Sequence, residues 1–502
     1  MADEANSTGR SVARNIIYSS TTWLLPVLLS FLATPVIVRA LGNEDYGIYA
    51  LISGFIAYSF NFNIGRALTK YIAEYRAAGE NEKIRDIISA TLFVNLTIGG
   101  IGLLAIVLSA DFLVDSVFRI EAAARAKSVE AFYVSALIIF FTMLNQVFNA
   151  ILQGIQRYDV YSKIFNFYNI LLIGGNLALA FAGFKLLGLL WWNLIVTFPT
   201  GFLLFRTARR YLPEFGIGFG FGRHTVWKVI GYSWAVVAYQ ILANVLLLFE
   251  RTWITRYLGT ESLTYYVVPM MIAVYMQSFI SSLMLVVFPL ASELQQERGK
   301  LLRLYLKATK TVAFLVVFMV LSLAIESRQF LTLWMGENFA ANSTDLLVIH
   351  SLAFGLSALC IISWYLADGL GHPNYNCLIF VVCFIICAAG FILWGDQNNR
   401  IALARLAGFG TMFFSVFYVE KWFFGKVQIG FWLRLTGVLG LAAVGAGLVE
   451  FLLATVLPVK WPSLVGSVAA GGLVYLGILW AAGFIDEEEK ALFYRLIGKN
   501  IE

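Results

Sequence analysis

Arg66 and Lys70 stand in a long apolar stretch of the chain. A charge at the centre of a transmembrane helix costs roughly 2.5 to 3.5 kcal/mol, so such residues usually face a cavity or a partner. Steps of about 100° along one helix would gather four polar side chains on a narrow arc, namely Ser59, Asn63, Arg66 and Lys70. Arginine binds phosphate oxygens in a bidentate manner and lysine supplies a point charge. The arc therefore predicts an anion site, although both basic side chains could instead reach lipid phosphates at the interface.

A second polar face is expected between residues 228 and 253. Gln240, Asn244 and Arg251 share one side of this segment, and Glu250 lies beside them. The first three are candidate substrate ligands. Glu250 is a candidate ion-coupling group, or else it pairs with Arg251 at the membrane interface.

Amides and isolated acids complete the candidate site residues. Asn145 and Asn149 are spaced by four residues, and their amides could bind sugar hydroxyls or join helices to one another. Asp368 and Glu450 are further candidates for ion coupling, although Asp368 could equally lie at the interface.

The elements that must position these residues are apolar helices. Hydrophobic residues form 60% of the 502 residues, charged residues 13%, and the mean hydropathy is +0.78. About 20 apolar residues cross the hydrocarbon core as a helix, which predicts an all-α polytopic membrane protein with about fourteen spans. These are 15–38, 46–68, 86–109, 131–152, 161–183, 186–206, 228–253, 264–291, 308–326, 345–369, 374–394, 402–420, 434–457 and 463–484.

Basic residues alternate between the connecting segments. With these spans, 25 of the 36 Lys and Arg lie on the side that holds both termini. Cytoplasmic segments retain basic residues, so we expect both termini to lie in the cytoplasm. We also expect the protein to reside in the plasma membrane. No cleavable signal peptide is expected, and the net charge of +6 reflects this bias rather than a nucleic-acid site.

A short internal repeat divides the chain. LGNEDYGIY follows the first span and LGTESLTYY follows the seventh, which predicts two parallel six-helix lobes with a cavity at their interface. We expect an N-terminal lobe over 1–212, a cytoplasmic linker over 213–227, a C-terminal lobe over 228–425, and two additional helices with a cytoplasmic tail over 426–502. Prolines within the early spans of each lobe would allow the bending that alternating access requires.

The sequence lacks the motifs of ATP-binding and metal-binding proteins. The sequence has no GxxxxGK[ST] phosphate loop and no CxxC or Cys-His group at metal-ligand spacing. We therefore expect no cofactor, no metal and no ATP site, so transport energy would come from an ion gradient, the substrate gradient or a partner.

Five stretches resemble a known family. NIIYSSTTW followed by LGNEDYGIY, then NIGRALTKYIAEY, LFERTWITRYLG and VVFPLASEL, are similar to the oligosaccharide flippases of the multidrug, oligosaccharidyl-lipid and polysaccharide exporter superfamily. The resemblance implies two six-helix lobes around a central cleft and translocation of a polyprenyl-diphosphate-linked oligosaccharide by alternating access. It also implies coupling to protons or sodium ions, and that the last two helices could form a groove for the lipid tail. Membrane lipids, and glycan polymerases or glycosyltransferases, are the expected partners.

Two alternatives remain at this stage. A multidrug or cation antiporter of the same superfamily would use acidic residues deep in its N-terminal half, whereas the first six spans offer Arg66 and Lys70. A membrane-embedded glycan polymerase or glycosyltransferase would carry a sizeable outer loop with paired carboxylates or a catalytic histidine, and the outer segments here are short. The sign of the charge favours the flippase.

Overall fold

The structure is a computed structural model that describes residues 2–484, except 60–64, 214, 217, 219–221, 285–286, 288–290, 292–293 and 295. The side chains of residues 2–20, Arg66 and residues 231–239 also lie outside the described part. Over the described residues all regular structure is helical and no strand occurs. The chain forms two compact units, Met1–Thr264 and Tyr265–Glu502.

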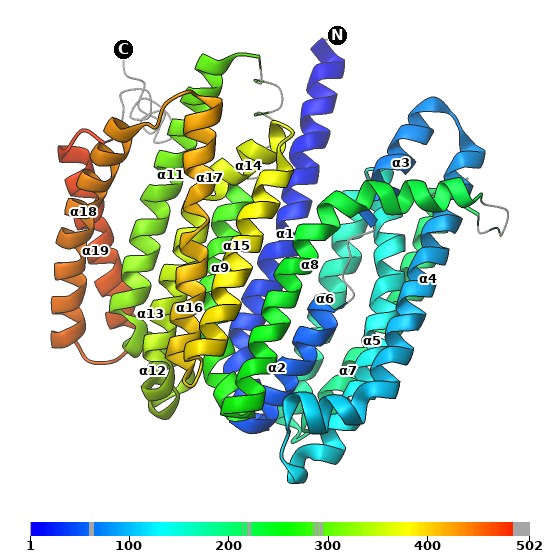
Figure 1. Ribbon diagram of the computed structural model, residues 1–502, viewed down its shortest axis with the longest axis horizontal. Helices are drawn as coiled ribbons and strands as arrows, with labels where there is room; N and C mark the ends of the chain where they lie inside the picture. The colour runs from blue at the N-terminus through cyan, green and yellow to red at the C-terminus, as the bar shows by residue number, and fades with distance from the viewer. Residues whose placement is uncertain are drawn as a thin grey trace. The chain divides into compact units, whose positions relative to one another are not determined.

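The first unit is built from long antiparallel helices (Figure 1). They are α1 (Ala2–Leu41), α2 (Asn43–Tyr58), α3 (Gly65–Ala78), α4 (Asn81–Phe112), the π-helical turn η1 (Leu113–Phe118), α5 (Ala122–Gly154), α6 (Tyr158–Phe181), α7 (Leu186–Tyr211) and α8 (Arg223–Leu258). Helix α9 (Thr260–Met284) begins in this unit and continues into the second.

The second unit continues the same architecture. Its remaining elements are α11 (Arg298–Ile325), α12 (Ser327–Met335), α13 (Glu337–Leu359), α14 (Ile361–Gly369), α15 (Pro373–Trp394), α16 (Asn398–Gly410), α17 (Phe413–Tyr418), the π-helical turn η2 (Val419–Phe423), α18 (Ile429–Val456) and α19 (Trp461–Ala481).

The prediction of a polytopic helical membrane protein is confirmed. Among the described residues, twelve helical segments are long and apolar enough to cross a membrane, and they coincide with twelve of the predicted spans. The other two predicted ranges, 46–68 and 228–253, contain α2 with α3, and α8. The expected lobe boundaries, and the cavity expected between the lobes, stay predictions.

The span expected over 46–68 is not one helix with the assumed bounds. Helix α2 ends at Tyr58 and α3 begins at Gly65, with Ser59 outside both. Helical phase is kept only along an unbroken helix, so a common arc from Ser59 to Lys70 does not follow from counting residues. Asn63 lies outside the described part of the chain.

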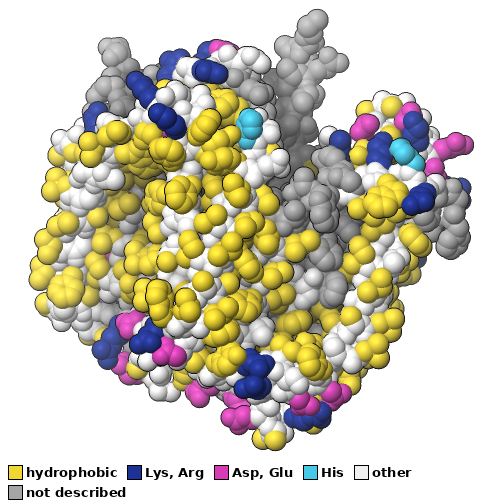
Figure 2. All heavy atoms as spheres, viewed as in Figure 1, with side chains coloured by type: hydrophobic (Ala, Val, Ile, Leu, Met, Phe, Trp, Pro, Cys, Tyr) yellow, Lys and Arg dark blue, Asp and Glu magenta, His cyan; other side chains and the backbone are white. Residues whose placement is uncertain are grey.

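The lateral surface of each unit is apolar. Figure 2 shows hydrophobic side chains over the flanks of the helices and charged side chains gathered near their ends. Large apolar residues stand fully outward, such as Leu108 on α4 and Leu473 on α19, which are 83% and 73% exposed. Exposed apolar surface of this extent is stable against lipid tails rather than water.

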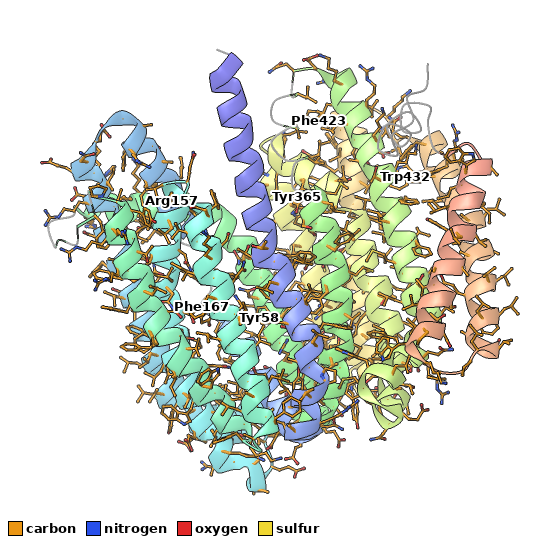
Figure 3. All side chains as sticks on the ribbon, turned by 180° about the vertical axis from the view of Figure 1, so that it is seen from behind. Tyr58, Arg157, Phe167, Tyr365, Phe423 and Trp432 are labelled. Carbon is orange, nitrogen blue, oxygen red and sulfur yellow. The ribbon has the colours of Figure 1, made fainter. Side chains whose placement is uncertain are left out.

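Helices α18 and α19 are attached to the rest of the second unit by specific polar contacts. Tyr475 on α19 donates its hydroxyl to the carbonyl of Phe314 on α11 at 3.0 Å. Glu420 in η2 is fully buried. Its carboxylate accepts from the Tyr305 hydroxyl at 2.8 Å, the Trp432 indole N–H at 2.7 Å and the main-chain N–H of Gln428 at 2.7 Å. Figure 3 labels Trp432 and Phe423, the last residue of η2. One carboxylate thus joins α11, η2 and the start of α18.

The repeated LG sequences adopt the same turn. Gly42 precedes α2 with φ 84° and ψ 160°, and Gly259 precedes α9 with φ 89° and ψ 166°. Gly336, in a similar LWMGEN context before α13, has φ 105° and ψ 163°. Positive φ values of this kind favour glycine, because a Cβ would clash with the backbone. The glycines therefore set the sharp reversal from one long helix to the next.

Candidate functional site

The first unit encloses a polar cavity of about 480 Å³ on the inner faces of α5, α6 and α7. Its polar lining comes mainly from amides and hydroxyls spaced by three or four residues along α5, which is the periodicity of one helix face. The polar lining residues are Thr142, Asn145, Gln146, Asn149, Gln153, Tyr161, Tyr168 and Thr200. Asn145 and Asn149, both predicted from the sequence, are thereby brought to one wall.

A second cavity of about 390 Å³ shares Thr142, Gln146 and Tyr168 with the first. The two therefore adjoin, and together they run along the inner face of α5. Helices α2, α6 and α7 add further polar groups to the second cavity, namely Tyr49, Ser53, Asn169, Asn176, Asn193 and Thr197.

Some of these amides hold the wall in place. Asn145 donates to the carbonyl of Thr197 on α7 at 3.1 Å. The approach is close because α7 has a glycine there: a Cβ on Gly201 would lie 2.3 Å from Asn145 Oδ1. The Tyr168 hydroxyl lies 3.2 Å from Thr197 Oγ1. Helix packing and cavity lining thus use the same residues.

Other amides keep bonding capacity for a ligand. Asn176 and Asn193 are 3% and 8% exposed, and the Oδ1 atom of each has no hydrogen-bond partner. A buried carbonyl oxygen without a partner costs about 1 to 3 kcal/mol, which a donor from a ligand or a water molecule would offset. No charged side chain is among the described residues that line either cavity. The site is suited to a polyhydroxylated, uncharged group.

The predicted basic site lies next to the first cavity along the chain. Gly65, the first residue of α3, lines that cavity, and Arg66 follows it with a side chain outside the described part. Lys70 is exposed, and its ammonium lies 5.0 Å from the ring centroid of Tyr71. Lys228 on α8 packs over the same ring at 4.5 Å. Two ammonium groups beside one aromatic ring form a basic cluster that the sequence pattern missed.

The turn between α5 and α6 follows Gln153, which lines the first cavity. Arg157 in this turn binds Asp159 through two nitrogens, at 2.9 and 3.0 Å. Its guanidinium carbon also lies 4.0 Å from the ring centroid of Tyr211 on α7. Figure 3 shows Arg157 at this end of the helices. The bidentate pair and the ring fix the positions of the helix ends beside Gln153.

The polar face predicted on α8 is divided between two environments. Gln240 and Asn244 are half-buried and line neither cavity. Arg251 is 7% exposed, donates to the carbonyl of Ala50 on α2, and lies 5.6 Å from the ring centroid of Tyr58, which Figure 3 labels. Glu250 beside it is completely buried. Arg251 therefore packs between helices in the first unit.

The acids predicted for ion coupling in the second unit are both held by polar neighbours. Asp368 on α14 is half-buried and accepts from the Asn376 amide at 2.8 Å. Glu450 on α18 is completely buried and accepts from Ser322 at 2.9 Å. Among the described residues no group of three or more His, Cys, Asp and Glu could hold a metal ion.

The chain is similar to known proteins over much of its length. The family model of polysaccharide biosynthesis proteins matches residues 12–295. A protein of Shigella flexneri, named as an O-antigen transporter, is 22% identical over 386 residues, which are 74% of this chain and 87% of the relative.

Solved structures share the fold. A lipid II flippase, MurJ, in its inward closed conformation matches with a TM-score of 0.71 and 14% identity, over 97% of this chain and 100% of its own. An inward-facing multidrug resistance MATE transporter of the MOP superfamily matches with a TM-score of 0.63 and 15% identity, over 82% of this chain and 95% of its own.

Proposed function

The chain belongs to the polysaccharide biosynthesis protein family, and from that premise we propose that it is a flippase for a polyprenyl-diphosphate-linked oligosaccharide. It would move this lipid across the cytoplasmic membrane for the synthesis of a cell-surface polysaccharide. The relatives that match are named as transporters and flippases, and membrane enzymes of glycan assembly are correspondingly disfavoured.

The observation that carries the proposal is the pair of adjoining cavities in the first unit. Their polar walls are amides and hydroxyls, and no charged side chain is among the described residues that line them. Amides donate and accept at once, as do sugar hydroxyls, so such walls fit an oligosaccharide. Gln146 and Tyr168 line both cavities and would contact adjacent sugar units. We assign substrate contacts first to Asn145 and Asn149.

The diphosphate requires positive charge. Arg66 follows the cavity-lining Gly65 directly in α3, and Lys70 stands one helical turn further along. We assign the diphosphate to this start of α3, with Arg66 as the bidentate ligand and Lys70 as a supporting charge. Asn63 belongs to the same proposed group. Gln240, Asn244 and Arg251 are proposed as contacts of the substrate in a second conformational state.

The energy source is proposed to be an ion gradient, with protons or sodium ions as the coupling ion. Glu250, Asp368 and Glu450 are the carboxyl groups assigned to it, because a buried acid changes its contacts when it gains or loses a cation. Both termini are proposed to face the cytoplasm, as the distribution of Lys and Arg favours.

A multidrug or cation antiporter is the alternative within the same fold. Cationic compounds would be expected to bind carboxylates, and the described residues that line the two cavities include none. The lining therefore favours a neutral glycan.

Reconstitution tests the proposal directly. Purified protein in liposomes is supplied with a fluorescent polyprenyl-diphosphate oligosaccharide, and its exposure on the opposite leaflet is followed by a membrane-impermeant quencher. We expect protein-dependent translocation of the glycolipid and no uptake of small organic cations. Uptake of the cations without movement of the glycolipid would instead establish the antiporter.

A further inference from the structure

Two buried carboxyl groups meet in the second unit, away from the cavities described above. Glu326 directly follows α11 and is 3% exposed, and Glu450 on α18 is 0% exposed. Ser467 on α19 donates to Glu326 Oε1 at 2.5 Å and lies 3.2 Å from the main-chain oxygen of Glu450. Ser322 on α11 donates to Glu450 Oε1 at 2.9 Å. Ser467 thus links the Glu326 carboxyl to the main chain of Glu450, and Ser322 holds the Glu450 carboxyl, so both acids belong to one hydrogen-bonded network.

One oxygen of each carboxyl group has no hydrogen-bond partner. The Oε2 atoms of Glu326 and Glu450 are buried and have no hydrogen-bond partner. An ionised carboxylate in such a place keeps a buried charge that no cationic side chain of the described residues neutralises, which is costly. Two neighbouring carboxylates raise that cost further, because like charges repel most strongly where the dielectric is low. A bound proton removes the charge without requiring additional space.

We propose that Glu326 and Glu450 form a proton-binding site that holds at least one proton between its two carboxyl groups. The ligand is a proton rather than a metal ion, since the two serines supply the only further oxygens among the described side chains of the network and each already bonds a carboxyl. The titration described below distinguishes a proton site from a sodium site.

The surrounding charges do not neutralise the pair. Apart from Glu326 itself, Tyr275 of α9 is the titratable side chain among the described residues that line the adjoining cavity. On α12, Arg328 pairs with Glu337 of α13 at 2.9 Å, and their side chains are 71% and 61% exposed. Lys460 at the start of α19 is exposed.

The other basic residues of the packed helices lie elsewhere along them. Arg434 is near the opposite end of α18 from Glu450. The basic residues of α11 lie in its first half, between Arg298 and Lys310. In the described part of the chain, no ion pair reaches either carboxyl.

A proton has a path to the pair. A cavity of about 410 Å³ adjoins it, and both Glu326 and Ser322 stand in the cavity wall among apolar side chains such as Phe318 and Leu464. Glu326 is reached from the cavity directly, and Glu450 is reached through Ser322. A site with access to a cavity can exchange its proton, whereas a sealed carboxyl would hold it permanently.

The backbone around Glu450 is adapted to this side chain. A Cβ on Gly471 of α19 would lie 2.3 Å from Glu450 Oε1. The carboxyl therefore occupies space that any other residue at position 471 would fill. Ionisation would place a negative charge between α18, α19 and α11 and weaken their packing, so the proton controls how firmly the last helix pair is attached. Its use in energy coupling rests on the proposed flippase function.

Infrared spectroscopy tests the site without transport. Spectra of the purified full-length protein are compared with those of E326Q, E450Q and the double variant, with the exposed E337Q as a matched control. We expect the difference spectrum between wild type and the double variant at neutral pH to show a protonated-carboxyl component that shifts in heavy water, and E337Q to keep that component. Glutamine keeps the shape and a hydrogen-bonding oxygen, and thermal unfolding identifies any variant that does not fold.

Titration tests the coupling of the two groups. In the wild type, loss of the last proton would leave two neighbouring carboxylates that repel each other. The protonated-carboxyl band should therefore persist to a pH about one unit higher in the wild type than in either single variant. Identical titration of wild type and single variants, or a band unchanged in the double variant, overturns the proposal. Loss of the band on adding sodium at constant pH also overturns it, because it makes the pair a sodium site.

Transport separates this proposal from the flippase function. In liposomes, an imposed pH gradient should change glycolipid translocation several-fold in the wild type and have no effect in the double variant. Wild-type protein that moves no glycolipid would contradict the proposed function, whereas the infrared result would still decide the proton site.

Discussion

Thr264 donates its hydroxyl to the main-chain carbonyl of Asn43 at 2.5 Å. The two residues belong to the two copies of the repeated segment, LGNEDYGIY and LGTESLTYY, which meet within the first unit. Asn43 also donates to Glu261 at 3.3 Å. Each repeat segment thus donates one side-chain hydrogen bond to the other.

Substitution of Gly47 should break this contact. A Cβ on Gly47 would lie 1.8 Å from the carbonyl oxygen of Thr260, which is main chain and cannot rotate away. We expect G47A to destabilise the protein by about 1 to 3 kcal/mol or more, as overpacking does, and to lower the thermal unfolding temperature in detergent. Gly100 on α4 has no atom within 4 Å of its Cβ position, so G100A is the matched control. Equal stability of the two variants would contradict the packing described.

Asn176 and Asn193 should contribute to substrate affinity with little effect on stability. Each has a free Oδ1 in the second cavity, and a lost hydrogen bond of about 1 kcal/mol corresponds to a several-fold weaker affinity. We expect N176A and N193A to raise the glycolipid concentration for half-maximal translocation about three- to tenfold. Asn95 is a buried amide that bonds within its own helix, so N95A should leave that concentration unchanged.

Arg66 should be required for the diphosphate. We expect R66Q to insert and fold normally and to translocate the fluorescent glycolipid at least tenfold more slowly, since it removes a charged bidentate contact. Arg76 lies on the same helix and is exposed, so R76Q makes the same change of charge away from the cavity. Unchanged translocation by R66Q in liposomes would remove Arg66 from the site.

Glu420 should be a stability residue rather than a transport residue. It accepts from Tyr305, which is buried, and from Gln428 and Trp432, which are half-buried. Removing the shared acceptor leaves the buried donor unsatisfied at about 1 to 3 kcal/mol and weakens the other two contacts. We expect E420A to unfold at a clearly lower temperature than wild type and E420Q to fall between them, because glutamine keeps one oxygen. If E420A unfolds at the wild-type temperature, the carboxylate does not attach α18 to α11.

The sequence determined the elements of this protein well. A stretch of about 20 apolar residues forms a helix in the hydrocarbon core because its backbone groups have no other partners there. Hydropathy therefore predicted the all-α class and the order of the spans. It also singled out Asn145, Asn149 and Glu450 as costly polar residues, and the structure places the first two on one cavity wall. The family resemblance quoted from five short stretches agrees with the family match.

Helix continuity was the weaker part of the sequence prediction. The single helix expected over 46–68 ends at Tyr58, since hydropathy measures the polarity of a segment and not its backbone geometry. The polar arc drawn from Ser59 to Lys70 depended on that continuity. The repeated glycines were visible in the sequence, but their common positive φ was not.

Only the tertiary structure decided which polar residues act together. Asn176 and Asn193 come from different helices, and so do Glu326 and Glu450, yet each pair shares one environment. The insertion of a helix depends on its own residues, whereas its neighbours depend on how small residues such as Gly201 and Gly471 let another helix approach. That packing is a property of several distant segments at once, so no periodicity within one segment could reveal it.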